Sequence, residues 1–116
     1  MNAFLWVLQI LLAVAFVGSG GAKLSQPKDR LRPHMPFVEE YGQAQVRAIG
    51  AVEVLGGVGV VLPWLTGIAP VLTPLAAAGL GITMILAAAV HRRRKESIAV
   101  NLVLLAVAVI VAVGRF

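Results

Sequence analysis

The sequence predicts an all-α integral membrane four-helix bundle that forms a single transmembrane domain over residues 1–116. The first observation is the composition: 59% of the residues are hydrophobic and 13% are charged, whereas soluble domains carry about 45–50% apolar and about 25% charged residues. A chain of this size cannot bury so much apolar surface in a water-soluble core. The second observation is the pattern, because the charged residues are confined to short segments between long apolar runs.

Four apolar segments are each close to the ~20 residues that a helix needs to cross the hydrocarbon core of a bilayer. The expected helices cover residues 3–22, 46–62, 69–90 and 97–113. Open strands are excluded because their edges would leave backbone groups unpaired in lipid, and these segments lack the period-2 alternation of a membrane barrel. The first segment lacks the basic start of a cleaved signal peptide, so it is interpreted as a membrane helix.

The first connection is the longest and separates the first two expected helices. Three prolines within it prevent a continuous helix through its first half. Its second half, PFVEEYGQAQ, is expected to form a short interfacial helix that turns Phe37, Val38 and Tyr41 toward the membrane.

The distribution of Lys and Arg predicts the orientation. These residues gather in the first connection and in the third, HRRRKE, whereas the second, PWLTGIAP, carries no charge. Because cytoplasmic loops of membrane proteins are enriched in Lys and Arg, both basic connections are expected to face the cytoplasm and both termini the outside. Arg115, a basic residue near the C-terminal end of the last expected helix, weakly favours the opposite orientation. The run Arg92–Lys95 is interpreted as a topology determinant that contacts anionic headgroups, so the net charge of +5 does not indicate a nucleic-acid partner.

Polar residues of the four expected helices fall in the same half of the membrane. At ~1.5 Å of rise per residue, Glu53 lies roughly 10 Å inside the second helix. It shares a helix face with Gly50 and Gly57, and small residues allow another helix to approach closely. Glu53 is therefore expected to point into the bundle. The polar side chains expected near it are Ser19, Lys23, Thr83, His91 and Asn101.

An ionised carboxylate at this depth is costly unless it is paired. Two ways of avoiding the cost of a buried, unpaired charge stay open at this point. Lys23 or Arg47 could supply a counter-charge, or the Glu53 carboxyl group could remain protonated. Lys23 is the preferred partner because its flexible side chain can reach inward from the same membrane side. Arg47 lies on a different face of the helix that carries Glu53 and is expected to extend toward the headgroups.

Two interpretations of these polar residues stay open, a buried network that fixes helix packing and a small pocket. In the pocket, Glu53 is the candidate catalytic group, acting as a general acid or base. The candidate ligand-binding residues are Lys23, Ser19, His91, Asn101 and Thr83. No metal site is expected and no cofactor can be assigned. The chain has no Cys, which excludes disulfides, thiol redox centres and thiolate metal sites.

Four stretches of the sequence together resemble the DoxX-like family of small bacterial membrane proteins with four helices. They occur in order along nearly the whole chain: GSGGAKL (18–24), GAVEVLGGVGVVLP (50–63), PLAAAGLGITMILAAAVHRRR (74–94) and NLVLLAVAVIVAVGRF (101–116). The resemblance implies a multi-pass protein of the bacterial inner membrane. Its motif positions fall on Lys23, Glu53, His91 and Asn101.

The polar residues and the resemblance together lead to three hypotheses for the function. The founding members are named for a subunit of a thiosulfate:quinone oxidoreductase, which implies a subunit that binds a quinone or another apolar molecule and docks a redox partner. The second hypothesis is a stand-alone membrane enzyme that uses Glu53 on an apolar substrate. The third is a non-catalytic scaffold or chaperone for membrane proteins. The lipid bilayer is the expected environment, and self-association into a homo-oligomer is left open.

Overall fold

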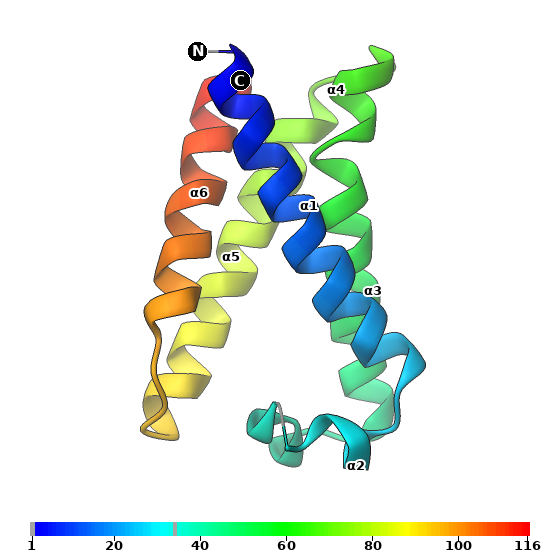
Figure 1. Cartoon of the computed structure of the whole chain (residues 1–116), viewed down its shortest axis with the longest axis vertical. Coiled ribbons are helices and arrows are strands. Elements are labelled where there is room, and N and C mark those ends of the chain that lie inside the picture. Colours follow the sequence, from blue (N-terminus) through cyan, green and yellow to red (C-terminus); the bar gives the residue numbers. More distant parts are fainter. Residues whose placement is uncertain (1, 34) are drawn as a thin grey trace.

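The structure, a computed structural model, describes residues 2–33 and 35–116. Its four long helices are α1 (Asn2–Ser25), α3 (Gln43–Gly59), α5 (Leu72–Arg93) and α6 (Ala99–Arg115), and its short ones are α2 (Lys28–Leu31), the 3-10 helix η1 (Pro36–Glu40) and α4 (Leu62–Thr66) (Figure 1). The predicted all-α membrane bundle is confirmed. Three helical spans are long and apolar enough to cross a membrane, namely α1, α3 continued through α4, and α5, and α6 is a shorter apolar helix of 17 residues.

The long helices form two pairs of neighbours that are also paired in sequence order (Figure 1). Helix α1 packs along α3, and α5 packs along α6. Both termini and α4 lie at one end of the bundle, which we call the terminal end; α2, η1 and the turn between α5 and α6 lie at the other, which we call the basic end. The two pairs lie close together toward the terminal end and separate toward the basic end.

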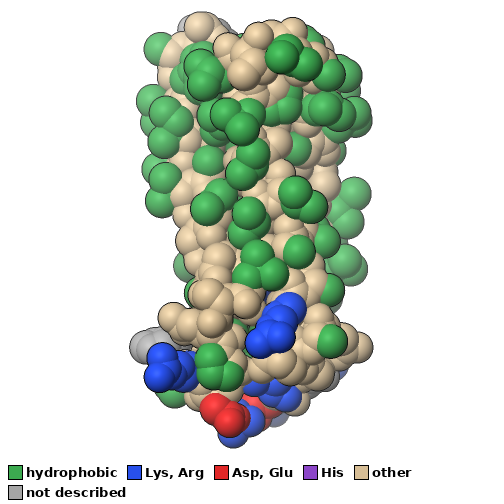
Figure 2. All heavy atoms as spheres, turned by 90° about the vertical axis from the view of Figure 1, so that its right-hand side faces the viewer, with side chains coloured by type: hydrophobic (Ala, Val, Ile, Leu, Met, Phe, Trp, Pro, Cys, Tyr) green, Lys and Arg blue, Asp and Glu red, His purple; other side chains and the backbone are tan. Residues whose placement is uncertain are grey.

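Apolar side chains both fill the bundle and cover its outside. The buried core consists of Leu12, Phe16, Val60, Ala77, Leu80, Met84, Ala108 and Val111. Hydrophobic side chains also spread over most of the face shown in Figure 2, whereas charged side chains gather at the basic end. Leu55 and Val113, for example, are 72% and 73% exposed. A surface of this kind fits contact with lipid acyl chains, as expected for a membrane protein.

The long first connection differs from the expected single interfacial helix. It contains two short helices, α2 and η1, separated by residues 32–35. Val38 was expected to face the membrane, and this expectation is wrong: Val38 is fully buried and packs with Leu31 and Val46 in a small second core. The connection therefore folds back across the basic end, and its apolar side chains pack against the helices.

A close approach of α1 and α3 depends on two facing glycines. A Cβ atom on Gly20 would lie 2.5 Å from the carbonyl oxygen of Gly50, and a Cβ atom on Gly50 would lie 2.7 Å from the carbonyl oxygen of Gly20. No larger residue fits at either position without separating the two backbones. Small residues at a membrane helix contact permit this approach, as the glycine pattern around Glu53 predicts.

The second expected helix, residues 46–62, ends earlier than predicted, because Pro63 interrupts it. Helix α3 ends at Gly59, and α4 starts at Leu62. Pro63 has no N–H to donate to the carbonyl oxygen of Gly59. The Thr73 hydroxyl donates to that oxygen at 3.3 Å and also accepts a hydrogen bond from the Trp64 N–H at 3.1 Å.

The same interruption also frees the carbonyl oxygen of Val60, which the Trp64 N–H would reach in a continuous helix. Here the side-chain amide of Gln9 donates to it at 2.6 Å. Gln9 is fully buried in α1. Its amide oxygen in turn accepts a hydrogen bond from Arg115 Nε at 2.8 Å. Gln9 therefore connects α1 with the end of α3 and the end of α6.

Arg115, which the sequence suggested only as a weak orientation signal, is a buried structural residue at the terminal end. Besides Gln9, its guanidinium donates to Asn2 Oδ1 at 2.8 Å. It also lies over the ring of Trp64 at 4.5 Å and that of Trp6 at 5.7 Å. Cation–π contacts strengthen where water is excluded. These contacts close the terminal end of the bundle around α1, α4 and α6.

We expect Gln9→Leu to lower the free energy of unfolding by about 2–3 kcal/mol, because it leaves the Val60 carbonyl and Arg115 Nε buried without their partner. The matched control is Gln26→Leu, since Gln26 is exposed. Thermal or chemical unfolding in detergent micelles measures the difference. Equal stabilities for the two variants would contradict the proposed role of Gln9.

Candidate functional site

Lys23 on α1 and Glu53 on α3 form a buried ion pair near the basic end. Lys23 Nζ donates a hydrogen bond to Glu53 Oε1, and the two residues are 6% and 3% exposed. Lys23 Nζ also donates to the Ser19 hydroxyl at 3.2 Å, one helical turn earlier. The expected pairing of Glu53 with Lys23, rather than with Arg47, is therefore present. The Gly20–Gly50 contact brings α1 and α3 close enough for it.

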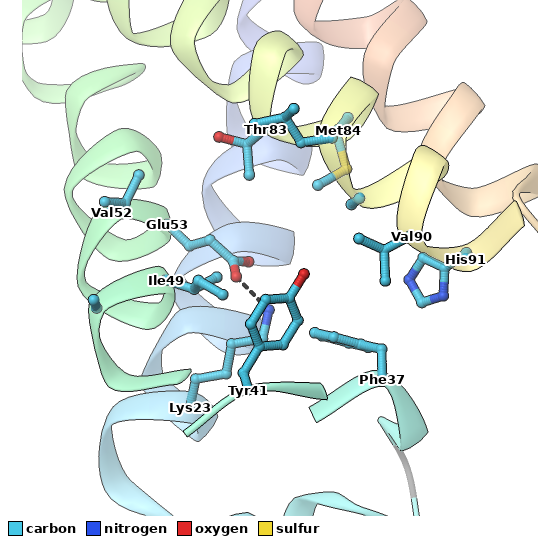
Figure 3. A pocket seen from close by; sticks show the side chains of 13 residues that line it. Lys23, Phe37, Tyr41, Ile49, Val52, Glu53, Thr83, Met84, Val90 and His91 are labelled. Atoms are coloured by element: carbon cyan, nitrogen blue, oxygen red, sulfur yellow. Dashed lines mark hydrogen bonds and ion pairs between the residues drawn. The ribbon is translucent and has the colours of Figure 1, made fainter. Parts of the chain in front are cut away.

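The ion pair forms part of the wall of a cavity between α3 and α5 (Figure 3). The cavity has a volume of about 360 Å³, within the range of small-molecule sites. Its walls are mostly aliphatic and aromatic. The lining residues are Lys23, Phe37, Tyr41, Ala48, Ile49, Val52, Glu53, Thr83, Met84, Leu86, Ala87, Val90 and His91.

The six candidate site residues divide into three groups. Lys23, Glu53, Thr83 and His91 all line the cavity. Ser19 does not line it, but its hydroxyl accepts a hydrogen bond from Lys23 Nζ. Asn101 lies one layer away: it is buried on α6, and its side-chain nitrogen is 3.7 Å from the sulfur of Met84, which does line the cavity. Thr83 donates its hydroxyl proton to the Gly79 carbonyl at 3.0 Å, so toward the cavity it offers only an acceptor.

Two aromatic residues of the first connection complete the site, and the sequence did not indicate them as site residues. Phe37 and Tyr41 line the lower part of the cavity as Figure 3 shows it. Lys23 Nζ is 5.2 Å from the centre of the Phe37 ring, and that ring meets His91 edge-on at 5.2 Å. In the sequence, Phe37 and Tyr41 are interspersed with polar residues, a pattern that indicates only an amphipathic segment. That the segment folds over the cavity depends on tertiary contacts that local pattern does not encode.

The turn after α5 holds His91 in place. His91 Nδ1 is 2.7 Å from Glu96 Oε1, and Arg94 Nε is 3.5 Å from Glu96 Oε2. The hydrogen bond with His91, and to a smaller extent Arg94, lowers the pKa of Glu96 below its ordinary value of 4.5. The turn also contacts the first connection, because Arg94 Nη2 is 3.9 Å from Glu39 Oε2.

A pH titration of the Glu96 carboxyl group tests the hydrogen bond between His91 and Glu96. A carboxylate with a lowered pKa stabilises the folded state above its unfolded pKa, and that contribution is lost as the pH falls through the folded pKa. We expect Glu96 to titrate below pH 4.5 and, in His91→Leu, closer to 4.5. Carboxyl chemical shifts measured by NMR follow the titration. Identical midpoints in both proteins would contradict the contact between His91 and Glu96.

The site offers hydrogen bonding and proton exchange next to an apolar volume. Its polar groups are an ammonium, a carboxylate, an imidazole and two hydroxyls, those of Tyr41 and Thr83. Among the side chains that the structure describes, no group of three or more from His, Asp or Glu could hold a metal ion. The arrangement therefore suits an apolar ligand with a small polar group.

Comparison with curated proteins and with solved structures finds no match. The DoxX-like family, in contrast, matches residues 7–113, a range that includes most of each of the four long helices and every residue of the cavity. The resemblance in the sequence motifs and this match agree. The chain therefore belongs to the DoxX-like family of membrane proteins.

Proposed function

We propose that this protein is a membrane-embedded binding protein whose cavity between α3 and α5 holds an apolar small molecule beside Lys23 and Glu53. The observation that carries the proposal is a cavity of about 360 Å³ with a buried ion pair in an otherwise mostly apolar wall. A pair needed only for packing has no reason to adjoin an open volume. In a redox complex, a quinone is the candidate ligand and a partner subunit supplies the electrons.

The ion pair gives the cavity polarity without net charge. Glu53 and Lys23 neutralise each other, and both can still hydrogen-bond to a ligand, since an ammonium has three donors and a carboxylate several acceptor positions. In a low-dielectric site such groups orient a ligand more strongly than in water. With the basic connections in the cytoplasm, the cavity lies in the cytoplasmic half of the inner membrane and both termini lie outside.

Thermal unfolding with and without a decyl-tailed benzoquinone tests this function. A ligand at a hundred times its Kd stabilises the folded state by about 2.7 kcal/mol, so we expect a clear rise in Tm for the wild type. The rise should vanish in Glu53→Gln and persist in Glu39→Gln, a matched change of a carboxylate outside the cavity. No response of the wild type to this quinone or to other apolar molecules would refute the binding function.

A second candidate function is catalysis by Glu53. It is favoured by the position of the carboxylate, which adjoins both the cavity and a protonated amine. General acid–base catalysis requires such a group within reach of the substrate. Catalysis would appear as turnover of an apolar substrate that disappears in Glu53→Gln while the ligand-dependent rise in Tm is retained in part.

The third candidate, a scaffold for a membrane partner or a second copy of this chain, rests on the lipid-facing helices alone. It predicts no ligand response, together with a loss of stability in Glu53→Gln. The unfolding experiment therefore separates the scaffold from the two functions that need a ligand, and the turnover assay separates catalysis from binding alone.

A further inference from the structure

The cavity opens sideways between α3 and α5, toward the lipid. Val52 on α3 and Leu86 on α5 both line it, and both are largely exposed, at 55% and 64%. A side chain that faces both the cavity and the surroundings forms part of the rim of an opening. In a membrane these two side chains lie among acyl chains, so the opening leads into the bilayer.

The basic end of the cavity, in contrast, is covered. Phe37 and Tyr41 cross it, and Phe37 contacts both Lys23 and His91 (Figure 3). Three contacts hold the segment that carries these two residues against the bundle. Val38 is buried in the second core, and Lys28 Nζ donates a hydrogen bond to the Tyr41 carbonyl at 2.7 Å. Glu39 Oε2 lies 3.9 Å from Arg94 Nη2. This segment therefore lies across the direct path from water at the basic end.

Tyr41 presents a hydrogen-bonding group to the cavity that the protein itself does not use. Its hydroxyl points into the cavity, which Glu53 also lines (Figure 3). None of the described residues forms a hydrogen bond with this hydroxyl. Lys23 and Glu53, by comparison, are already engaged with each other, and a ligand could reach only their remaining donor and acceptor positions. Tyr41 is thus the group best placed to recognise a ligand without breaking an existing interaction.

We propose that the cavity takes up an uncharged, membrane-dissolved amphiphile through the opening between Val52 and Leu86, and that the Tyr41 hydroxyl orients its polar head. This inference rests on the proposed binding function and adds the class of ligand and its route. The head lies near Tyr41 and the ion pair, and the apolar tail passes out between α3 and α5. An anionic head is disfavoured, because the charge of Lys23 is already neutralised by Glu53 and a buried ion without a counter-charge is costly.

Photocrosslinking in phosphatidylcholine vesicles tests the inference. The probes are a long-chain alcohol with a diazirine in its tail and the fatty acid with the same tail. We expect the alcohol to crosslink to α3 and α5 and the acid to do so much less. Leu86→Trp and Val52→Trp should lower the crosslinked fraction several-fold by blocking the rim. The matched controls Leu102→Trp and Val103→Trp, exposed on α6 and outside the cavity, should leave it unchanged.

A further variant addresses the polar head. Tyr41→Phe keeps the ring and removes only the hydroxyl, so we expect the affinity for the alcohol to fall about fivefold, the effect of one lost hydrogen bond. Affinity unchanged in Tyr41→Phe would overturn the role of Tyr41, and equal labelling by the acid would overturn the uncharged class.

The remaining outcomes separate this inference from the binding function. Labelling that is insensitive to both rim variants but lost in Glu53→Gln would overturn lateral entry and leave the binding function intact. Wild-type labelling no higher than that of Glu53→Gln would overturn both proposals.

Discussion

Gly20→Ala is expected to lower the free energy of unfolding by about 3 kcal/mol, the upper range for forcing extra volume into a packed contact. The added methyl group would lie 2.5 Å from the Gly50 carbonyl oxygen and 2.9 Å from the Val54 nitrogen. Both are backbone atoms, so no side-chain rotation can relieve the clash and α1 must move away from α3. The movement separates Lys23 from Glu53, and the quinone-dependent rise in Tm should disappear as well.

The matched control is Gly21→Ala on the same helix. A Cβ atom there would meet nothing within 4 Å. Alanine also favours a helix over glycine by about 1 kcal/mol, so this variant should be as stable as the wild type or slightly more stable. Unfolding of both variants in the same detergent gives the comparison. If Gly20→Ala were as stable as Gly21→Ala, the close approach of α1 and α3 would be wrong.

Lys23→Met is expected to destabilise the protein by about 3–5 kcal/mol, because it leaves the Glu53 carboxylate buried without its counter-charge. The double variant Lys23→Met/Glu53→Gln should recover much of this loss, since replacing both partners of a buried ion pair is far less costly than removing one. A double-mutant cycle measures the coupling between the two side chains.

Arg47→Met provides the control for this cycle, because it removes the other basic residue that the sequence offered as a partner. Arg47 is exposed, so its cycle with Glu53 should show almost no coupling. Additive effects for Lys23 and Glu53, or strong coupling between Arg47 and Glu53, would contradict the observed pairing.

Most of the bundle could be predicted from the sequence because lipid imposes simple rules on it. A spanning helix needs a long apolar run and leaves its charges at the ends, and these rules place all four long helices within a few residues. The same depth argument predicts that Lys23 and Glu53 meet, since two polar residues at one level of neighbouring helices have few other partners. Depth and helical phase favour this pairing, but they leave Arg47 and a protonated carboxyl group as alternatives, and the structure shows the contact with Lys23.

The ends of the helices depend on contacts that are distant in sequence. Pro63 signals an interruption, but nothing local indicates that Gln9 and Thr73 bond to the two carbonyl oxygens it frees. Arg115 likewise finds its partners at the opposite end of the chain, in Asn2 and Gln9. These side chains look isolated in the sequence because their partners become neighbours only after the helices pack.

The covering of the cavity could not be predicted for the same reason. The segment with Phe37 and Tyr41 has an amphipathic pattern, and an amphipathic segment can lie on a membrane or on its own protein. Burial of Val38 with Leu31 and Val46 decides between these alternatives. Asn101, in contrast, was predicted from its depth to lie at the pocket, but it is not among the lining residues and contacts Met84, which is.

The most direct test is a solid-state NMR measurement of magnetisation transfer between isotope-labelled lysine side-chain nitrogens and glutamate carboxyl carbons in lipid bilayers. The predicted result is a cross peak between Lys23 and Glu53 that is absent in Glu53→Gln and that shifts when the decyl-tailed benzoquinone is added to the wild type. A wild-type spectrum without this cross peak, or with a cross peak that saturating quinone leaves unchanged, would contradict a ligand-binding cavity built on this ion pair.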